Sequence, residues 1–508
     1  MRVETLHPLR PIEEVWRVAW PAALFLGCGV LVGWFAPRTF DGRLFPVLAA
    51  VGGIVFVTLL AVRPTFERVF HLLLLSLPLM TAFVINLGGF IRASFLLVLA
   101  GLLAALVEGR LAVVRRNLSV SLLHLFVLFS LVSTVLTLQI PNLRTLTESG
   151  IRGLPIRSLI QAGQLLLMVA AFHLTLSYVR TRADLERVVR FILWGAIFAS
   201  LYGFYELFAA LLKVPFLDLN NAALSRGNIT AGYTVAGVWL PRPRSTFFEP
   251  IGLATFLLFA GPLVAALAFG QRRRARRWGM LFGCVGMAAL FVAANSRAAL
   301  IGSALALGLV LLLVRTWQAR IVFLVVLIVV ATAFGAVVWL AAEDLWSADL
   351  VWVVVAERVG SVATLRGRTD ARTAAEEFYA EPRAIFAEHP LLGVGIGNLP
   401  FYVLHGGEGA QVATAGSLYV QLLTEGGIVG TGLFLAFVGS VCLSLLRVIL
   451  GTSDPALHRF ALASLTSVIA VLVTWIAVPG LYTDTYLWVM LALAVAIPRL
   501  RDRARWAA

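Results

Sequence analysis

Long apolar stretches separated by short polar segments dominate this chain. About fourteen of them approach the roughly 20 residues that a bilayer-crossing helix requires. They lie near 18–36, 44–62, 69–87, 93–108, 118–139, 156–178, 190–212, 248–270, 278–294, 297–314, 321–341, 426–447, 459–478 and 484–498. The ninth and tenth are almost contiguous and predict a tight hairpin or a partly re-entrant pair. The pattern predicts an all-α, polytopic integral membrane protein with about 14 transmembrane helices (12–14).

The composition agrees with this prediction. Of 508 residues, 60% are hydrophobic and only 13% are charged, against roughly 25% charged residues in ordinary soluble proteins. A water-soluble enzyme, a disordered protein and a nucleic-acid-binding domain are therefore excluded. The three cysteines, Cys28, Cys284 and Cys442, lie far apart in apolar stretches, so neither a disulfide framework nor a cysteine metal site is indicated.

The net charge of +15 comes from arginine, because Lys213 is the only lysine. Basic residues favour cytoplasmic loops, and an even number of spans places both termini on one side. The segments on that side hold most of the arginines, including the run Arg272–Arg277, so we expect both termini to be cytoplasmic. We interpret the run as an orientation signal near anionic lipid, and no nucleic acid is expected as a partner.

Two predicted outside loops are much longer than the others, and long loops are where binding and chemistry concentrate. They divide the chain into four regions. These are an N-terminal transmembrane region at 1–247 with its external loop at 213–247, central helices at 248–341, a large extracytoplasmic loop at 342–425 and C-terminal helices at 426–508. Within the large loop, Asp370–Glu388 is expected to be helical, with a kink or break at Pro382 and an end at Pro390.

Familiar catalytic signatures are missing from the sequence. There is no Walker motif, so ATP hydrolysis is not supported, and no Asp-x-Asp pair is present. No two histidines have metal-ligand spacing, and only His389 and His405 lie in predicted outside loops. We therefore expect no metal site and no cofactor.

The remaining candidates are arginines that face the predicted outer side. They are Arg244 in the segment 242–250, Arg297 after Ser296, Arg368 and Arg372 in the run 366–372, and Arg383. Arginine binds phosphate through a planar fork of donors that stays charged, and ionisable groups at membrane depth are functional candidates by default. Converging arginines would suit a diphosphate. The alternatives are snorkelling to lipid headgroups and, for 366–372, an ordinary solvated loop face.

Two residues could move a proton at this face. Glu249 precedes a proline at the start of a span, so it is either a helix N-terminal acid favoured by the helix dipole or a base facing the site. His389 precedes Pro390 and a glycine turn, where a structural role in the turn competes with acid–base work.

Two segments carry a resemblance to a known family. The segment EHPLLGVGIGN at 388–398, together with GSLYVQLLTEGGIVG at 416–430, resembles motifs of the O-antigen ligase and O-antigen polymerase superfamily. The segment RSTFFEP at 244–250, the pair Ser296-Arg297 and the segment 481–488 look like further family elements in the family's order. The resemblance covers about half the chain.

The resemblance implies a chemistry. Members of this superfamily transfer a glycan from a polyprenyl diphosphate carrier to a sugar hydroxyl on the outer face of the bacterial plasma (inner) membrane, without metal or nucleotide. External arginines hold the diphosphate, for which Arg244, Arg297, Arg383 and either Arg368 or Arg372 are the candidates here. Ser417, Tyr419 and Glu425 belong to the segment associated with the acceptor. A base would be Glu249, Asp370 or His389, unless none is required.

One departure separates the possible activities. Where ligases carry a His-Asn pair, this chain has Gly416 and Ser417. The missing histidine favours a polymerase of lipid-linked repeat units, unless His405 or His389 replaces it. The alternatives are a ligase that transfers finished glycan to a lipid or protein acceptor, and a flippase of lipid-linked glycan. The expected partners are the polyprenyl diphosphate-linked glycan and the lipid bilayer, with a chain-length regulator or a flippase as candidate protein partners.

Overall fold

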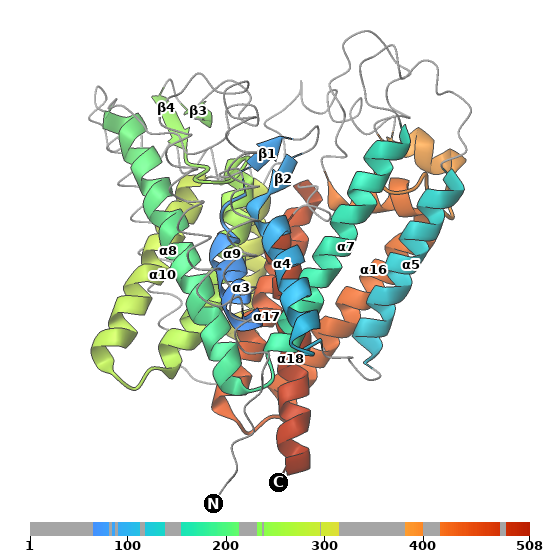
Figure 1. Cartoon of the computed structure of the whole chain (residues 1–508). Coiled ribbons are helices and arrows are strands. Elements are labelled where there is room, and N and C mark those ends of the chain that lie inside the picture. Colours follow the sequence, from blue (N-terminus) through green and yellow to red (C-terminus); the bar gives the residue numbers. More distant parts are fainter. Residues whose placement is uncertain are drawn as a thin grey trace, which may run out of the picture.

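The computed structural model describes residues 65–80, 84–86, 90–111, 117–137, 154–212, 231–235, 238–294, 296–313, 382–399, 417–477 and 484–507. The predicted spans near 18–36, 44–62 and 321–341 lie outside these residues. Nearly all of the described chain is helical, which confirms the predicted class (Figure 1).

Seven described helices are long and apolar enough to cross a membrane. They are α5 (Leu118–Thr137), α7 (Leu154–Tyr178), α8 (Arg182–Leu212), α9 (Pro250–Gly270), α10 (Arg274–Ala294), α16 (Leu418–Gly451) and α17 (Pro455–Thr474). Shorter or partly polar helices accompany them, namely α3 (Phe66–Ser76), α4 (Ala93–Val107), α11 (Arg297–Leu313), α18 (Thr485–Ala507) and the one-turn η3 (Trp475–Ala477).

Two antiparallel hairpins interrupt the helical pattern. Strand β1 (Val84–Asn86) pairs with β2 (Phe90–Arg92), and β3 (Ala231–Val235) pairs with β4 (Val238–Arg242). Both lie at the same end of the bundle as the short helix at 382–388 (top of Figure 1). We call this end the site end.

The predicted span at 69–87 is wrong. Helix α3 ends at Ser76, and Pro78, which has no backbone N–H to continue a helix, follows. The chain then enters β1, and the next residues, Leu87-Gly88-Gly89, carry turn-forming glycines. Apolar residues alone therefore did not distinguish a span from a short helix followed by a hairpin.

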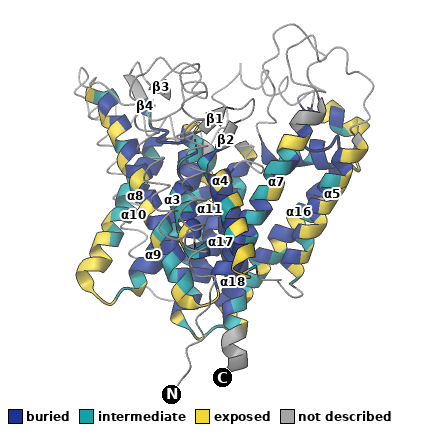
Figure 2. Cartoon of the chain, in the orientation of Figure 1, coloured by how far each residue is buried: buried dark blue, intermediate teal, exposed yellow. Residues whose placement is uncertain are grey.

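Helices α17 and α18 form the centre of the bundle. From Tyr486 to Ile497, every residue of α18 is buried (Figure 2). Helix α17 packs against α9, α11 and α16, while α18 packs against α7 and α16. Helices α10 and α11 adjoin in sequence but do not form a packed hairpin, because α10 lies against α9 and α8 and α11 lies against α17.

Candidate functional site

The loop from Pro243 to Glu249 joins β4 to α9 at the site end and carries the predicted Arg244. The backbone amides of Arg244 and Ser245 both donate to Oε2 of Glu206 on α8, at 2.9 and 2.7 Å. The Arg244 guanidinium Nε lies 3.9 Å from the other carboxylate oxygen of Glu206. Both side chains are buried. A buried carboxylate is costly unless it is paired and hydrogen-bonded, and this loop supplies both.

The same loop is strained and held on several sides. Ser245 has φ of 54°, a left-handed conformation that is uncommon for a residue other than glycine. Its Oγ donates to the Ala199 carbonyl on α8 at 2.8 Å, and the Thr246 hydroxyl donates to the Pro78 carbonyl at 2.6 Å. Such strain persists only where the surroundings fix the backbone, and it concentrates at functional sites.

A second buried ion pair lies beside this loop. Arg92, the last residue of β2, has its Nη1 3.5 Å from Oδ1 of Asp484, which directly precedes α18. The Tyr486 hydroxyl donates to Asp484 Oδ2 at 3.3 Å, and Arg92 also lies 3.4 Å from the Met80 sulfur. Burial lowers the pKa of the Arg92 guanidinium, and the Asp484 carboxylate opposes that shift.

The two ion pairs form one unit, which we call the arginine cluster: Arg92, Glu206, Arg244 and Asp484. The Phe247 ring of the loop contacts the Tyr486 ring edge-on, with centroids 6.3 Å apart. Thr246 bonds Pro78, while Arg92 contacts Met80 two residues further on. The cluster and its contacts therefore join the segment after α3, β2, α8, the 243–249 loop and the start of α18.

Sequence reasoning selected Arg244 but missed the other three as site residues. A usable signal existed. Glu206 is a carboxylate inside the apolar stretch 190–212, and Arg92 directly precedes the stretch 93–108. Charged residues at such places are costly, so each of them required a partner.

The predicted Arg297 begins α11, and its side chain lies outside the described part of the chain. Its backbone is placed close to the Arg244 loop, because Arg242 Nε donates to the Ala294 carbonyl at 3.1 Å. Ser296 is buried, and its Oγ accepts from the Ala299 amide at 3.4 Å. The Ser296-Arg297 pair thus begins two residues after Ala294, whose carbonyl is held by Arg242 of β4.

The predicted motif at 388–398 forms a turn at the site end that interlocks with α16, and we call residues 389–399 the glycine turn. The amides of Val394 and Gly395 donate to the carbonyls of Thr424 and Glu425, each at 2.9 Å. The Gly397 amide donates to Glu425 Oε1 at 3.0 Å. In return, the Ile428 amide donates to the Pro390 carbonyl at 2.8 Å.

This interlock breaks α16. Gly427 has φ of 60° and ψ of −165°, so the helix is kinked there and the predicted span at 426–447 begins at a break. A Cβ on Gly427 would lie 2.3 Å from the Leu391 oxygen, and one on Gly393 would lie 2.5 Å from the Glu425 carbonyl. Both glycines also have positive φ. Only glycine fits at either position.

Three further contacts fix the turn to neighbouring helices. The Ser133 hydroxyl on α5 donates to the Leu392 carbonyl at 2.8 Å, and Thr134 Oγ1 accepts from the Ile396 amide at 2.9 Å. On α7, the Ser158 hydroxyl donates to Oδ1 of Asn398. The turn therefore connects α5, α7 and α16 through hydrogen bonds.

The structure gives the predicted acceptor residues packing contacts. Glu425 is buried and holds the turn. The Tyr419 hydroxyl donates to the Leu472 carbonyl at 2.8 Å, and the Ser417 hydroxyl donates to the Trp475 carbonyl at 3.4 Å. All three side chains thus bind neighbouring backbone.

The remaining predicted residues divide into two groups. Glu249, directly before α9, is exposed beside the Arg244 loop. Arg383 and His389 are exposed on the helix at 382–388 and at its end. This helix stops before Pro390, as the sequence predicted, while the predicted start at Asp370 lies outside the described residues. Asp370, Arg368 and Arg372 lie outside the described residues. In the described part of the chain, no group of three or more potential ligands could hold a metal ion.

The fold and this site define a multi-pass membrane protein with charged residues gathered at one end of its helix bundle. Residues 282–435 match the O-antigen ligase family, so the chain carries a domain of that family. The match includes Ser296, Arg297, the glycine turn and the kink of α16, whereas Arg244 and Asp484 lie outside it. No curated protein matches the chain in sequence.

Proposed function

We propose that this protein is a membrane glycosyltransferase that polymerises polyprenyl-diphosphate-linked oligosaccharide repeat units. The observation that carries the proposal is the Arg244 loop, in which the strained Ser245 and the buried residues 243–247 fix an arginine at the site end. The O-antigen ligase domain supports the same class of activity.

In the proposed reaction, the bond between the donor sugar and the carrier diphosphate breaks, and an acceptor hydroxyl oxygen forms the new glycosidic bond. The leaving diphosphate gains negative charge, which preorganised guanidinium groups stabilise. Arg244 and Arg297, with Arg368 or Arg372, bind the diphosphate, and Arg383 is a further candidate. Glu206 accepts hydrogen bonds from the backbone amides of Arg244 and Ser245. The backbone that carries the Arg244 guanidinium is therefore fixed.

The acceptor hydroxyl must lose its proton during transfer. Glu249, His389 and Asp370 are the proposed bases, and an exposed carboxylate beside the Arg244 loop supports Glu249. A base acts only within hydrogen-bond reach of the proton, directly or through one water. Glu249 and the donor-binding arginine lie on one loop, which brings acid–base and diphosphate chemistry together.

The choice of polymerase over ligase depends on the acceptor segment. Gly416 and Ser417 stand where ligases carry His-Asn, and the Ser417 hydroxyl binds the Trp475 carbonyl. A ligase-type histidine is therefore absent from those two positions, which favours a second lipid-linked repeat unit as the acceptor.

The proposed location is the bacterial plasma membrane, with the site end extracytoplasmic and both termini cytoplasmic. The turn at 272–277 lies at the opposite end of the bundle from the arginine cluster (Figure 1). Arginine-rich turns face the cytoplasm, which supports this orientation.

The decisive experiment supplies purified protein in vesicles with lipid-diphosphate oligosaccharide as the sole substrate. Longer lipid-linked product is the expected result. Product that appears only after a separate lipid or protein acceptor is added identifies a ligase. Translocation of intact substrate without any new glycosidic bond identifies a flippase, and either result overturns the polymerase proposal.

A further inference from the structure

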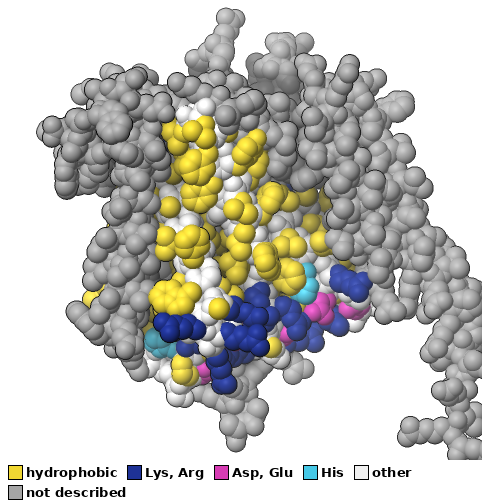
Figure 3. Space-filling view, turned by 90° about the vertical axis from the view of Figure 1, so that its left-hand side faces the viewer, with side chains coloured by type: hydrophobic (Ala, Val, Ile, Leu, Met, Phe, Trp, Pro, Cys, Tyr) yellow, Lys and Arg dark blue, Asp and Glu magenta, His cyan; other side chains and the backbone are white. Residues whose placement is uncertain are grey.

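The connection between α9 and α10, together with the first residues of α10, carries an unusual concentration of positive charge, and we call residues 272–277 the turn. Five arginines occupy the six positions 272–277, and all five are exposed. They lie at the end of the bundle opposite the arginine cluster. In the space-filling view, basic side chains form a band at that end, directly below an apolar surface (Figure 3).

Neighbouring arginines at this end are neutralised by acids, but the turn is not. Arg182 lies 3.0 Å from Glu186 and 3.7 Å from Asp454, and Arg187 lies 2.6 Å from Glu67. Within the described ranges, no aspartate or glutamate forms an ion pair with any arginine of the turn. The Arg277 guanidinium instead lies over the Phe269 ring, 5.4 Å from its centroid. Five like charges this close create a positive potential that attracts anions.

One face of the first half of α10, next to the turn, is exposed, while Met280 and Cys284 on this half of the helix pack against the core. The buried residues of α10 begin only at Met287. Trp278 is 60% exposed and Phe282 is 80% exposed, and their spacing places both on one side of the helix. A Cβ built on Gly279 or Gly283 meets no atom within 4 Å. A large apolar surface therefore continues directly from the arginines into the membrane.

The ligand that fits must offer negative charge and hydrocarbon together. We propose that the 272–277 turn, with Trp278 and Phe282, binds anionic phospholipids, whose phosphates meet the guanidinium forks while their acyl chains cover the exposed rings. Tryptophan favours this boundary between headgroups and hydrocarbon. Soluble phosphate and nucleic acid lack the acyl chains that the apolar surface requires.

Bound lipid has a structural consequence at the other end of α10. The helix runs from the turn to Ala294, whose carbonyl accepts from Arg242 beside the Arg244 loop. Anionic headgroups at the turn therefore hold at a defined depth the helix that borders the arginine cluster. Lipid binding itself is independent of the proposed enzymatic activity.

Trp278 provides the test. The full chain is reconstituted in vesicles of phosphatidylcholine and phosphatidylglycerol at a fixed ratio, with bromine placed on the chains of one lipid or the other. The Trp278 signal is the difference between wild type and Trp278→Phe. We expect brominated phosphatidylglycerol to quench it about twofold more than the brominated phosphatidylcholine does at equal mole fraction, because the basic turn enriches anionic lipid.

A matched pair of double variants localises the effect. Arg273→Gln/Arg276→Gln removes two charges from the turn and leaves three in place, so the orientation signal remains. Arg182→Gln/Arg190→Gln removes two charges from α8. The lipid preference is expected to fall in the first variant and to persist in the second. Equal quenching by both lipids in wild type, or equal loss in both variants, overturns the proposal.

Discussion

Glu206 Oε2 accepts a hydrogen bond from the backbone amide of Ser245 at 2.7 Å, and so a carboxylate within α8 fixes the strained residue next to Arg244. The bond links segments that are distant in sequence and holds the backbone rather than a side chain. The conformation of the 243–249 loop therefore depends on a residue that belongs to a different helix.

Replacing Glu206 tests this dependence. Glu206→Ala leaves the two amide donors of Arg244 and Ser245 without their acceptor, at a cost of about 1–3 kcal/mol for each buried unsatisfied group. Glu206→Gln keeps an oxygen acceptor and should retain most of the stability. The free energy of unfolding in detergent measures both changes. Equal stability of the alanine variant and wild type would show that the loop does not need Glu206.

Replacing Arg244 tests the diphosphate site. Arg244→Ala is expected to abolish polymer formation while the protein level in the membrane is maintained, because the developing phosphate charge loses its guanidinium. Arg244→Lys should retain only part of the activity, since a point charge cannot supply the planar fork. Polymer length and membrane abundance are measured together, with exposed Arg190→Ala as the control. Polymer of wild-type length in Arg244→Ala would show that Arg244 does not bind the diphosphate.

The Arg92–Asp484 pair predicts an asymmetric response. Asp484→Asn leaves a buried cation without its counterion and should cost about 3–5 kcal/mol of unfolding free energy. The reversed pair Arg92→Asp/Asp484→Arg should recover part of the loss. The comparison is the half-exposed pair Arg110–Glu108, at 2.9 Å, in which Arg110→Gln should cost about 0–1 kcal/mol and leaves Glu108 to accept from the Phe66 amide. A similar small effect at Asp484 would contradict the pairing.

The interlock of the glycine turn with α16 has a built-in control. Gly427→Ala would place a Cβ 2.3 Å from the Leu391 oxygen, so we expect little folded protein to reach the membrane. Gly439→Ala, on the same helix, meets no atom within 4 Å and should be neutral or stabilising by roughly 0.5–1 kcal/mol. Fluorescence-detected gel filtration of membrane extracts compares the two. Comparable folded yields would refute the steric argument.

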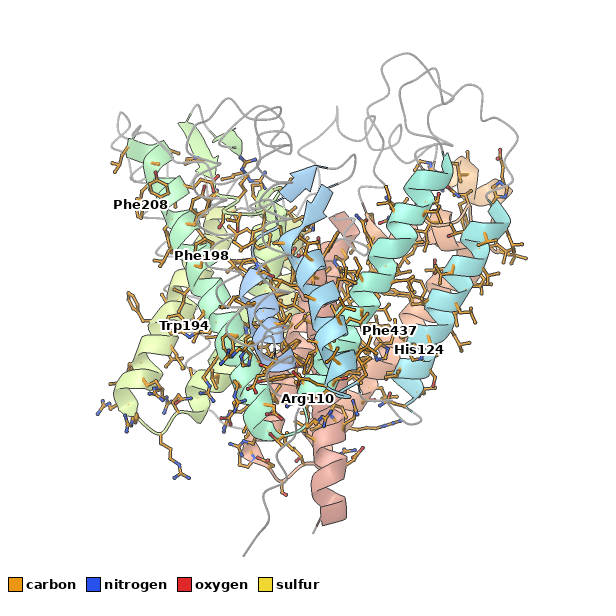
Figure 4. All side chains as sticks on the ribbon, viewed as in Figure 1. Arg110, His124, Trp194, Phe198, Phe208 and Phe437 are labelled. Carbon is orange, nitrogen blue, oxygen red and sulfur yellow. The ribbon has the colours of Figure 1, made fainter. Side chains whose placement is uncertain are left out.

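Sequence periodicity predicted most of the helices, because a span must be both long and apolar to satisfy its backbone in lipid. The boundaries moved where polar residues continue a helix beyond the bilayer, as at Arg182 in α8. Which face of each helix packs against the bundle was harder to predict from the sequence. On α8, Trp194, Phe198 and Phe208 point away from the bundle (Figure 4), whereas Glu206 is buried. Hydropathy alone does not predict which side of the helix faces the bundle.

The site was predictable in part. Arg244 and the glycine turn were found because their motifs are local in sequence. Arg92 and Asp484 were missed as partners because they lie 392 positions apart in the sequence, and no local pattern predicts a contact over that separation. Similarly, the Nε2 atoms of His124 and His173 lie 2.9 Å apart, although the spacing of the two residues in the sequence does not predict a contact.

Because the glycine turn docks on α16, its geometry does not depend on the length of the segment that follows it. The bonds from Val394 to Thr424 and from Gly395 to Glu425 close a loop whose intervening segment includes 400–416. For a flexible loop, closure entropy grows only with the logarithm of length, by about 0.6 kcal/mol for each doubling. Insertions between Leu399 and Ser417 should therefore cost little in folding. We expect an insertion there to leave the contacts of the turn with α16 in place, because those contacts lie on either side of the inserted segment.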